Sequence, residues 1–206
     1  MLDAELPGGG WPSGSLVEIL QGNAGRHVWQ LLLPTLASLG CKEEGPLVLV
    51  NPPHLPFGPA LAAQGISHNR LLRIEARQPK PGLWASEQAL RCADVIAVLA
   101  WLPNCRPADL RRLHLAAAQH HKMLFVFRGL EARNDSSPAR IRIAIADEEG
   151  LKVELLKRRG PPLVQPIELP AHPVRLQHLL DSRKRRRDTA ISRERSHVLD
   201  RTVAIA

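Results

Sequence analysis

One stretch of the chain, from Leu16 to Leu39, constrains the fold more than any other. Its apolar run Leu16–Leu20 predicts a buried strand, and the residues after Gly25 have the periodicity of an amphipathic helix. A short glycine-containing turn, Gln21–Gly25, separates the two. Strand–loop–helix units of this kind bind nucleotides when the backbone N–H groups of the loop wrap around the phosphates.

The loop lacks the residues that phosphate binding requires. A phosphate-binding loop has the spacing G-x-x-x-x-G-K-[ST], in which the lysine reaches the phosphates and the hydroxyl holds Mg²⁺. Here Gly22 and Gly25 are only three residues apart and are followed by Arg26 and His27. We therefore expect these four residues to form a degenerate loop, with no bound cofactor and no enzyme activity.

Apolar runs alternate with helical segments along most of the chain, which predicts an α/β fold with a mostly parallel sheet flanked by helices. Two later segments alternate apolar with polar residues and predict a C-terminal antiparallel hairpin with one solvated face. The expected strands are 16–20, 46–50, 71–75, 94–102, 123–127, 141–146, 151–157 and 166–169, and the expected helices after the first are 57–65, 83–93 and 107–120. Residues 3–15, rich in glycine and proline, predict an irregular lead-in.

Two residues are expected to shape the first helix. Pro34 removes a backbone hydrogen bond and should kink or split that helix, and Gly40 should end it. Among the tryptophans, Trp29, Trp84 and Trp101 are expected to pack in the core or at the sheet edge. Trp101 also marks the carboxyl end of the central strand, where open α/β sheets bind ligands.

Positive charge is concentrated in the second half of the chain. Residues 1–105 contain 7 Lys/Arg and 8 Asp/Glu, whereas residues 106–206 contain 21 and 12. We expect a core domain over residues 1–170 and a basic, partly disordered tail over 171–206. The cations expected to contact nucleic-acid phosphates or an acidic partner are Lys157, Arg158, Arg159, Arg183, Lys184, Arg185, Arg186 and Arg187.

Composition narrows the class of protein further. Hydrophobic residues make up 44% of the chain, which favours a globular fold, and aromatic residues only 3%, which disfavours a single-strand binder that stacks bases. No apolar run approaches the roughly 20 residues of a membrane span. The three cysteines show no C-x-x-C spacing, so we expect buried free thiols, no metal site and a cytoplasmic protein.

Several segments together resemble the ImuA family of SulA/RecA-like, DNA-damage-inducible proteins. They are Leu6–Leu20, Leu31–Leu39, Pro52–Ile66, Leu83–Arg91, Ala97–Leu102 and Leu155–Pro162. The resemblance implies a RecA-like core that lacks the catalytic and metal-binding carboxylates of RecA. Asn51 to His54 stand where RecA has its water-activating glutamate, and Leu99 or Ala100 stands in place of its metal-binding aspartate.

The resemblance implies a non-catalytic adaptor in the SOS response and translesion DNA synthesis. Its partners would be an ImuB-like Y-family polymerase homologue, with RecA, an error-prone DNA polymerase and DNA itself as further candidates. The alternative is a SulA-like cell-division inhibitor, because the SulA proteins share the core but block FtsZ polymerisation. SulA proteins are typically shorter, and the basic tail of this chain favours ImuA.

Overall fold

The computed structural model describes residues 2–23, 27–76, 78–146, 151–163 and 165–169. The predicted tail, residues 171–206, lies outside these ranges, as do Gly25 and Arg26 of the loop. No helix within the described ranges is both long enough and apolar enough to cross a membrane.

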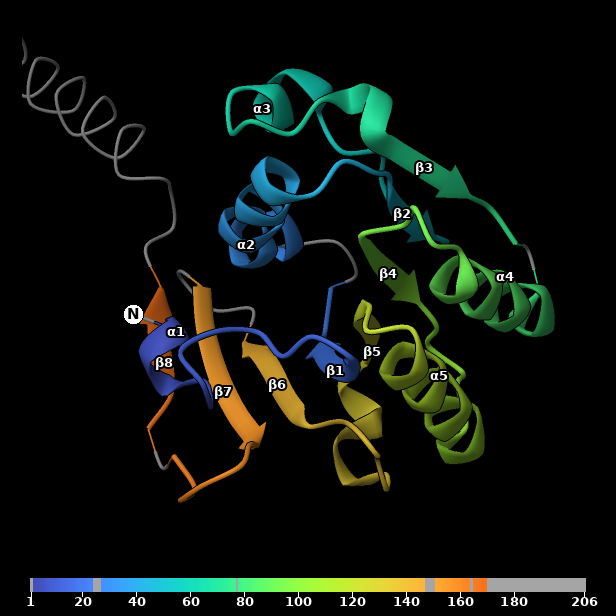
Figure 1. Ribbon diagram of the computed structural model, residues 1–206. Helices are drawn as coiled ribbons and strands as arrows, with labels where there is room; N and C mark the ends of the chain where they lie inside the picture. Colours follow the sequence, from blue (N-terminus) through green and yellow to red (C-terminus); the bar gives the residue numbers. More distant parts are fainter. Residues whose placement is uncertain (1, 24–26, 77, 147–150, 164, 170–206) are drawn as a thin grey trace, which may run out of the picture. The chain divides into compact units, whose positions relative to one another are not determined.

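A mixed sheet of eight strands runs through the described part of the chain, in the order β3-β2-β4-β5-β1-β6-β7-β8 (Figure 1). Neighbouring strands from β3 to β6 are parallel, whereas β6–β7 and β7–β8 are antiparallel. The strands are β1 (Ser15–Gln21), β2 (Leu47–Val50), β3 (Leu71–Ile74), β4 (Ala97–Trp101), β5 (Met123–Gly129), β6 (Ile141–Ala146), β7 (Leu151–Lys157) and β8 (Ile167–Leu169).

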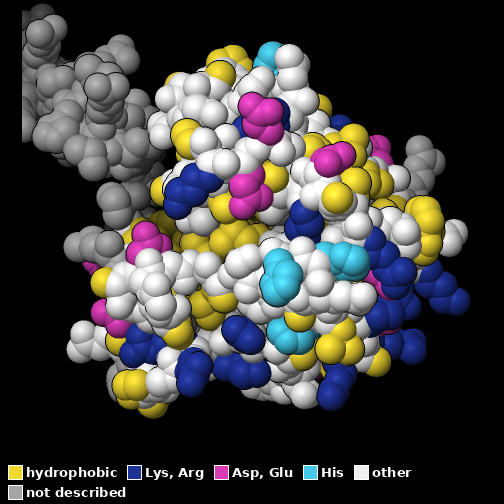
Figure 2. All heavy atoms as spheres, viewed as in Figure 1, with side chains coloured by type: hydrophobic (Ala, Val, Ile, Leu, Met, Phe, Trp, Pro, Cys, Tyr) yellow, Lys and Arg dark blue, Asp and Glu magenta, His cyan; other side chains and the backbone are white. Residues whose placement is uncertain are grey.

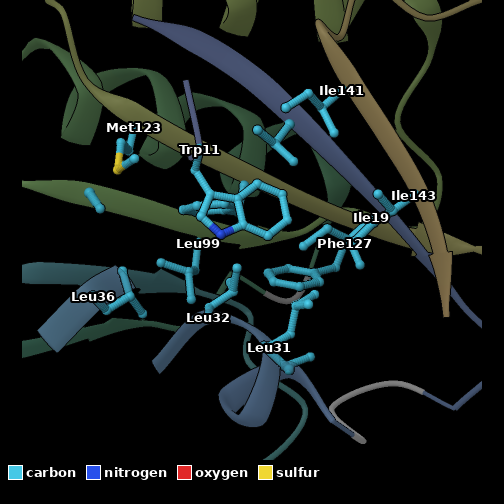
Figure 3. Close-up of a cluster of buried hydrophobic side chains, with 14 of the residues drawn as sticks. Trp11, Ile19, Leu31, Leu32, Leu36, Leu99, Met123, Phe127, Ile141 and Ile143 are labelled. Carbon is cyan, nitrogen blue, oxygen red and sulfur yellow. The ribbon is translucent and has the colours of Figure 1, made fainter. Parts of the chain in front are cut away.

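Helices cover both faces of the sheet (Figure 1). They are α1 (Leu2–Glu5), α2 (Val28–Lys42), α3 (Gly58–Ala62), α4 (Pro79–Arg91) and α5 (Pro107–Gln119), with short 3₁₀ turns η1 (His68–Arg70) and η2 (Leu130–Asn134). Because successive side chains of a strand point to opposite faces, each strand contributes to two cores. On one face lies the core that includes Leu31, Leu32 and Leu36 of α2, here called the α2 core; on the other lies the core that includes Leu90 of α4 and Leu110 of α5, here called the α4–α5 core. In β1, Val17 and Ile19 pack in the α2 core, and Leu16 packs in the α4–α5 core. Figure 3 shows Ile19 in the α2 core.

The lead-in is part of the α2 core, although the sequence predicts only an irregular backbone for it. It begins with the single-turn helix α1, and its side chains Leu2, Leu6 and Trp11 are buried. The Trp11 ring meets the Phe125 ring of β5 edge to face, with the ring centroids 5.5 Å apart. Figure 3 shows Trp11 over the sheet among side chains of β1, β4, β6 and α2. The lead-in therefore covers part of the sheet that α2 leaves open.

Two predictions about the first helix are wrong: Pro34 does not split it, and Gly40 does not end it. Helix α2 contains Pro34 in its interior, continues through Gly40 and ends at Lys42. Its buried residues Leu31, Leu32 and Leu36 lie on both sides of Pro34 and pack in the α2 core. This burial outweighs the roughly 3 kcal/mol that an internal proline costs.

Two expectations about exposure are also corrected. Trp84 is 62% exposed, because α4 turns its small residues Ala85 and Ala89 toward the sheet instead. Of the cysteines that we expected to be buried, Cys41 and Cys92 are exposed.

The predicted solvated face is absent from β6, since Ile141 to Ile145 are all buried. The covering element is η2, whose Ala132 packs against Ala144 of β6.

Candidate functional site

The loop after β1 is described at both of its ends. Gly22 lines a cavity, and His27 precedes α2 in a left-handed conformation with φ 61°. The His27 ring Nδ1 lies 2.9 Å from Oε1 of Gln30, so the ring contacts its own helix. Gly22 and His27 are thus placed, and Gly25 and Arg26 lie outside the described residues.

A cavity of about 560 Å³ opens at the carboxyl edge of the parallel strands. Its walls come from the ends of β1, β4 and β5, from the segments after β2 and β3, and from the first turns of α4. The lining residues include Trp101, as its place in the sequence predicts, and that ring stacks on Phe127 with centroids 4.4 Å apart. The side chains with polar groups in the lining are Gln21, Asn51, Gln78, Asn104, Cys105, Arg128 and Glu131.

Arg128 belongs to a buried charge cluster that links the cavity to the centre of the sheet. Nη1 of Arg128 donates to Oε1 of Glu18 at 2.9 Å, and Nε of Arg142 donates to Oε2 at 2.6 Å. The Glu18 side chain is fully buried. Asp135 accepts a second hydrogen bond from Arg128, at 2.8 Å. Burial alone lowers the pKa of Arg128, but its hydrogen bonds and charge pairing with Glu18 and Asp135 raise that pKa above its usual value.

Three buried polar atoms of the lining residues have no hydrogen-bond partner among the described residues. They are Oε1 of Gln21, Nε1 of Trp101 and Nε of Arg128. One is an acceptor and two are donors. Buried polar atoms in native proteins are nearly always paired, so three exceptions around one cavity are a departure from the norm.

Asn51 and Cys105 complete the polar part of the cavity. Asn51 has φ 53°, and its Oδ1 accepts a hydrogen bond from the backbone of Ala76 at 2.6 Å. Burial raises the pKa of the Cys105 thiol to about 12, with the Asp109 charge adding to the effect. No group of three or more metal-ligating side chains occurs within the described ranges.

A second, basic cavity lies at the opposite, amino edge of the sheet. Its volume is about 630 Å³, and its described lining holds Arg140, Lys157, Arg158 and Arg159 but no carboxylate. Lys and Arg side chains gather on the lower part of the face shown in Figure 2. The structure thus brings Lys157, Arg158 and Arg159 together, and Arg140 is a member that the sequence analysis missed. Residues 183–187 lie outside the described ranges.

Two of these cations have structural roles. Nη1 of Arg158 donates to the backbone and the carboxylate of Glu5, at 2.6 and 3.0 Å, and so ties β7 to the lead-in. Nζ of Lys157 donates to the carbonyl of Ser137 at 2.9 Å. Burial lowers the pKa of nearby His114, and the charges of Arg140 and Lys157 lower it further, which indicates a positive local potential.

No protein-family model matches the chain. The cell division inhibitor SulA of Yersinia pestis (strain Pestoides F) is 31% identical over 118 residues, which are 57% of this chain and 70% of that protein. The cell division inhibitor SulA of Edwardsiella piscicida is 28% identical over 106 residues, which are 52% of this chain and 63% of that protein, less than two thirds of its length.

A solved structure is also similar. It is the crystal structure of SulA from Pseudomonas aeruginosa, with 23% sequence identity and a TM-score of 0.44, covering 55% of this chain and 97% of that one. Both curated relatives are SulA proteins, so they support the SulA alternative better than the ImuA resemblance. Because the match to the Yersinia protein has 31% identity and covers 70% of that protein, the chain belongs to the SulA family.

Proposed function

We propose that this protein inhibits cell division by binding the division protein FtsZ and blocking its polymerisation. The observation that carries the proposal is the 31% identity to a protein named cell division inhibitor SulA, over 70% of that protein's length. Inhibition by binding requires no chemistry from the inhibitor. This fits a loop that has no lysine, serine or threonine between Gln21 and His27.

The expected result of producing the chain in dividing bacteria is long filaments with intact, regularly spaced DNA. In solution, about one equivalent of the purified chain should greatly reduce the FtsZ that sediments in the presence of GTP. An unrelated protein of equal positive charge is the control, because a net charge of +8 alone can aggregate an acidic polymer. Unchanged sedimentation at a several-fold excess of the chain would rule the proposal out.

We also infer that residues 1–170 form a RecA-like core that has lost its nucleotide chemistry, with residues 171–206 as a tail. The parallel order of β1 to β6, with the antiparallel pair β6–β7 at its end, supports this inference. The residues at the ends of two strands support it too. Asn51 follows β2, and Leu99 and Ala100 lie in β4, at the places where the RecA resemblance implies a water-activating and a metal-binding carboxylate.

The adaptor role in translesion synthesis, with an ImuB-like polymerase as partner, is a second candidate. The basic cavity favours it, since Arg140 and Arg159 have no ion-pair partner among the described residues and face a site without a lining carboxylate. The basic run of residues 183–187 adds positive charge in the sequence. Such surfaces bind nucleic-acid backbones by releasing counterions.

Under this second candidate, the double variant Arg140→Glu/Arg159→Glu weakens binding to a DNA duplex. The plot of log affinity against log salt should also flatten by about two units, because about 0.9 is lost per phosphate contact. Lys42→Glu/Lys80→Glu is the matched control, since both lysines are exposed and lie outside the basic cavity. Equal slopes for the two variants would remove DNA binding from this surface.

A further inference from the structure

The carboxyl-edge cavity has hydrogen-bonding groups that the unliganded chain leaves unused. Oε1 of Gln21, Nε1 of Trp101 and Nε of Arg128 are buried and lack partners among the described residues. The three side chains are only 5–6% exposed and come from three adjacent strands, β1, β4 and β5. A buried polar atom without a partner is costly, so a ligand that supplies the missing partners gains that free energy on binding.

The walls of the cavity match a flat molecule with polar edges. Trp101 is stacked on Phe127, and Leu83, Leu102 and prolines supply further apolar surface. The side-chain amides of the lining supply donors and acceptors around these walls. At about 560 Å³, the cavity lies within the usual size range of small-molecule sites.

The charges of the described lining residues disfavour a phosphate. Arg128 is the only cation of the described lining, and Glu18 and Asp135 already pair its terminal nitrogens. Glu131 adds a negative charge to the same wall. A polyphosphate would therefore meet a carboxylate and no unpaired cation among the described lining residues, whereas an uncharged ligand pays no such cost.

We propose that this cavity binds an uncharged heteroaromatic molecule of nucleoside size, which stacks on the aromatic wall and bonds with Gln21, Trp101 and Arg128. Because these three atoms are buried in the unliganded chain, binding includes a rotation of the Gln21 amide toward the ligand. The site does not depend on the proposed role in cell division, and its test uses a different assay.

The test is calorimetric titration of the full chain with adenosine, guanosine and uridine, and with ATP and magnesium. At least one nucleoside is expected to bind with a Kd of about 0.1 mM, from about 0.3 kcal/mol per heavy atom. ATP should bind no more tightly than adenosine. Two outcomes overturn the proposal: no heat from any nucleoside at millimolar concentration, or an ATP affinity tenfold above that of adenosine.

The substitution Gln21→Leu tests whether the unpaired oxygen of Gln21 binds a ligand or is only a defect in packing. It removes the orphan acceptor at nearly constant volume, so nucleoside affinity should fall about tenfold, the value of one hydrogen bond. The unliganded variant should melt at the same temperature as the parent or higher, because an unpaired buried acceptor is lost. Unchanged affinity in Gln21→Leu would overturn the proposal.

Gln119→Leu is the matched control, since Gln119 is exposed at the end of α5 and should change neither quantity. If Gln21→Leu does not fold, Leu83→Trp tests the same claim from α4, because a larger side chain on that wall narrows the cavity and should weaken nucleoside binding. Nucleoside binding that survives Leu83→Trp would likewise count against the site.

Discussion

Replacing Glu18 by alanine is expected to lower the free energy of unfolding by about 3–5 kcal/mol, the cost of removing one partner from a buried ion pair. The melting temperature should fall by about 6–20 °C for a chain of this size. Glu18 accepts from Arg128 at 2.9 Å and from Arg142 at 2.6 Å, in the interior of the sheet. Without its carboxylate, two guanidinium groups face each other away from water. Thermal melting followed by circular dichroism measures the loss.

Glu154→Ala is the matched control. Glu154 also pairs with an arginine, Arg133, but both side chains are more than one third exposed. Water screens such a pair, so its loss should leave the melting temperature nearly unchanged. Equal shifts for Glu18→Ala and Glu154→Ala would mean that the buried cluster does not stabilise the fold.

The buried charge cluster around Glu18 is a feature that the sequence did not predict, although the sequence did predict strands β6 and β7. Strands β6 and β7 begin and end as predicted, at Ile141–Ala146 and Leu151–Lys157, because their alternation of apolar and polar residues is local. The interaction of Glu18 with Arg128 and Arg142 joins residues 110 and 124 positions apart. Strand order and register decide this interaction, and neither is present in any local pattern.

The candidate site was predictable in part. Trp101 was placed at the carboxyl edge because it ends an apolar run, and the same rule applied to the other strands points to Gln21 and Asn51. The side-chain amides of Gln21 and Asn51 match no nucleotide-binding motif, so no motif points to them. Only the three-dimensional packing shows which polar atoms lack a partner. The position of Gln21 in the sequence therefore does not predict that it binds a ligand.

The burial of the lead-in could not be predicted from the sequence, because it depends on tertiary packing. Helix α1 has four residues, far too few to be stable by itself. Its order comes from Leu2, Leu6 and Trp11, which pack in the α2 core, and from Arg158, which bonds to Glu5. Glycine and proline content correctly indicated irregular backbone, but it carries no information about burial.

Trp11→Ala is therefore expected to cost about 3–5 kcal/mol of unfolding free energy, as for other buried aromatic residues cut back to alanine. Trp11 is 8% exposed and packs edge to face on Phe125, so its removal opens a cavity over β5. Trp84→Ala is the control and should change stability by no more than about 0.5 kcal/mol, since Trp84 is 62% exposed on α4. Urea denaturation of the two variants measures both values. A cost for Trp11→Ala no larger than that for Trp84→Ala would show that the lead-in does not complete the core.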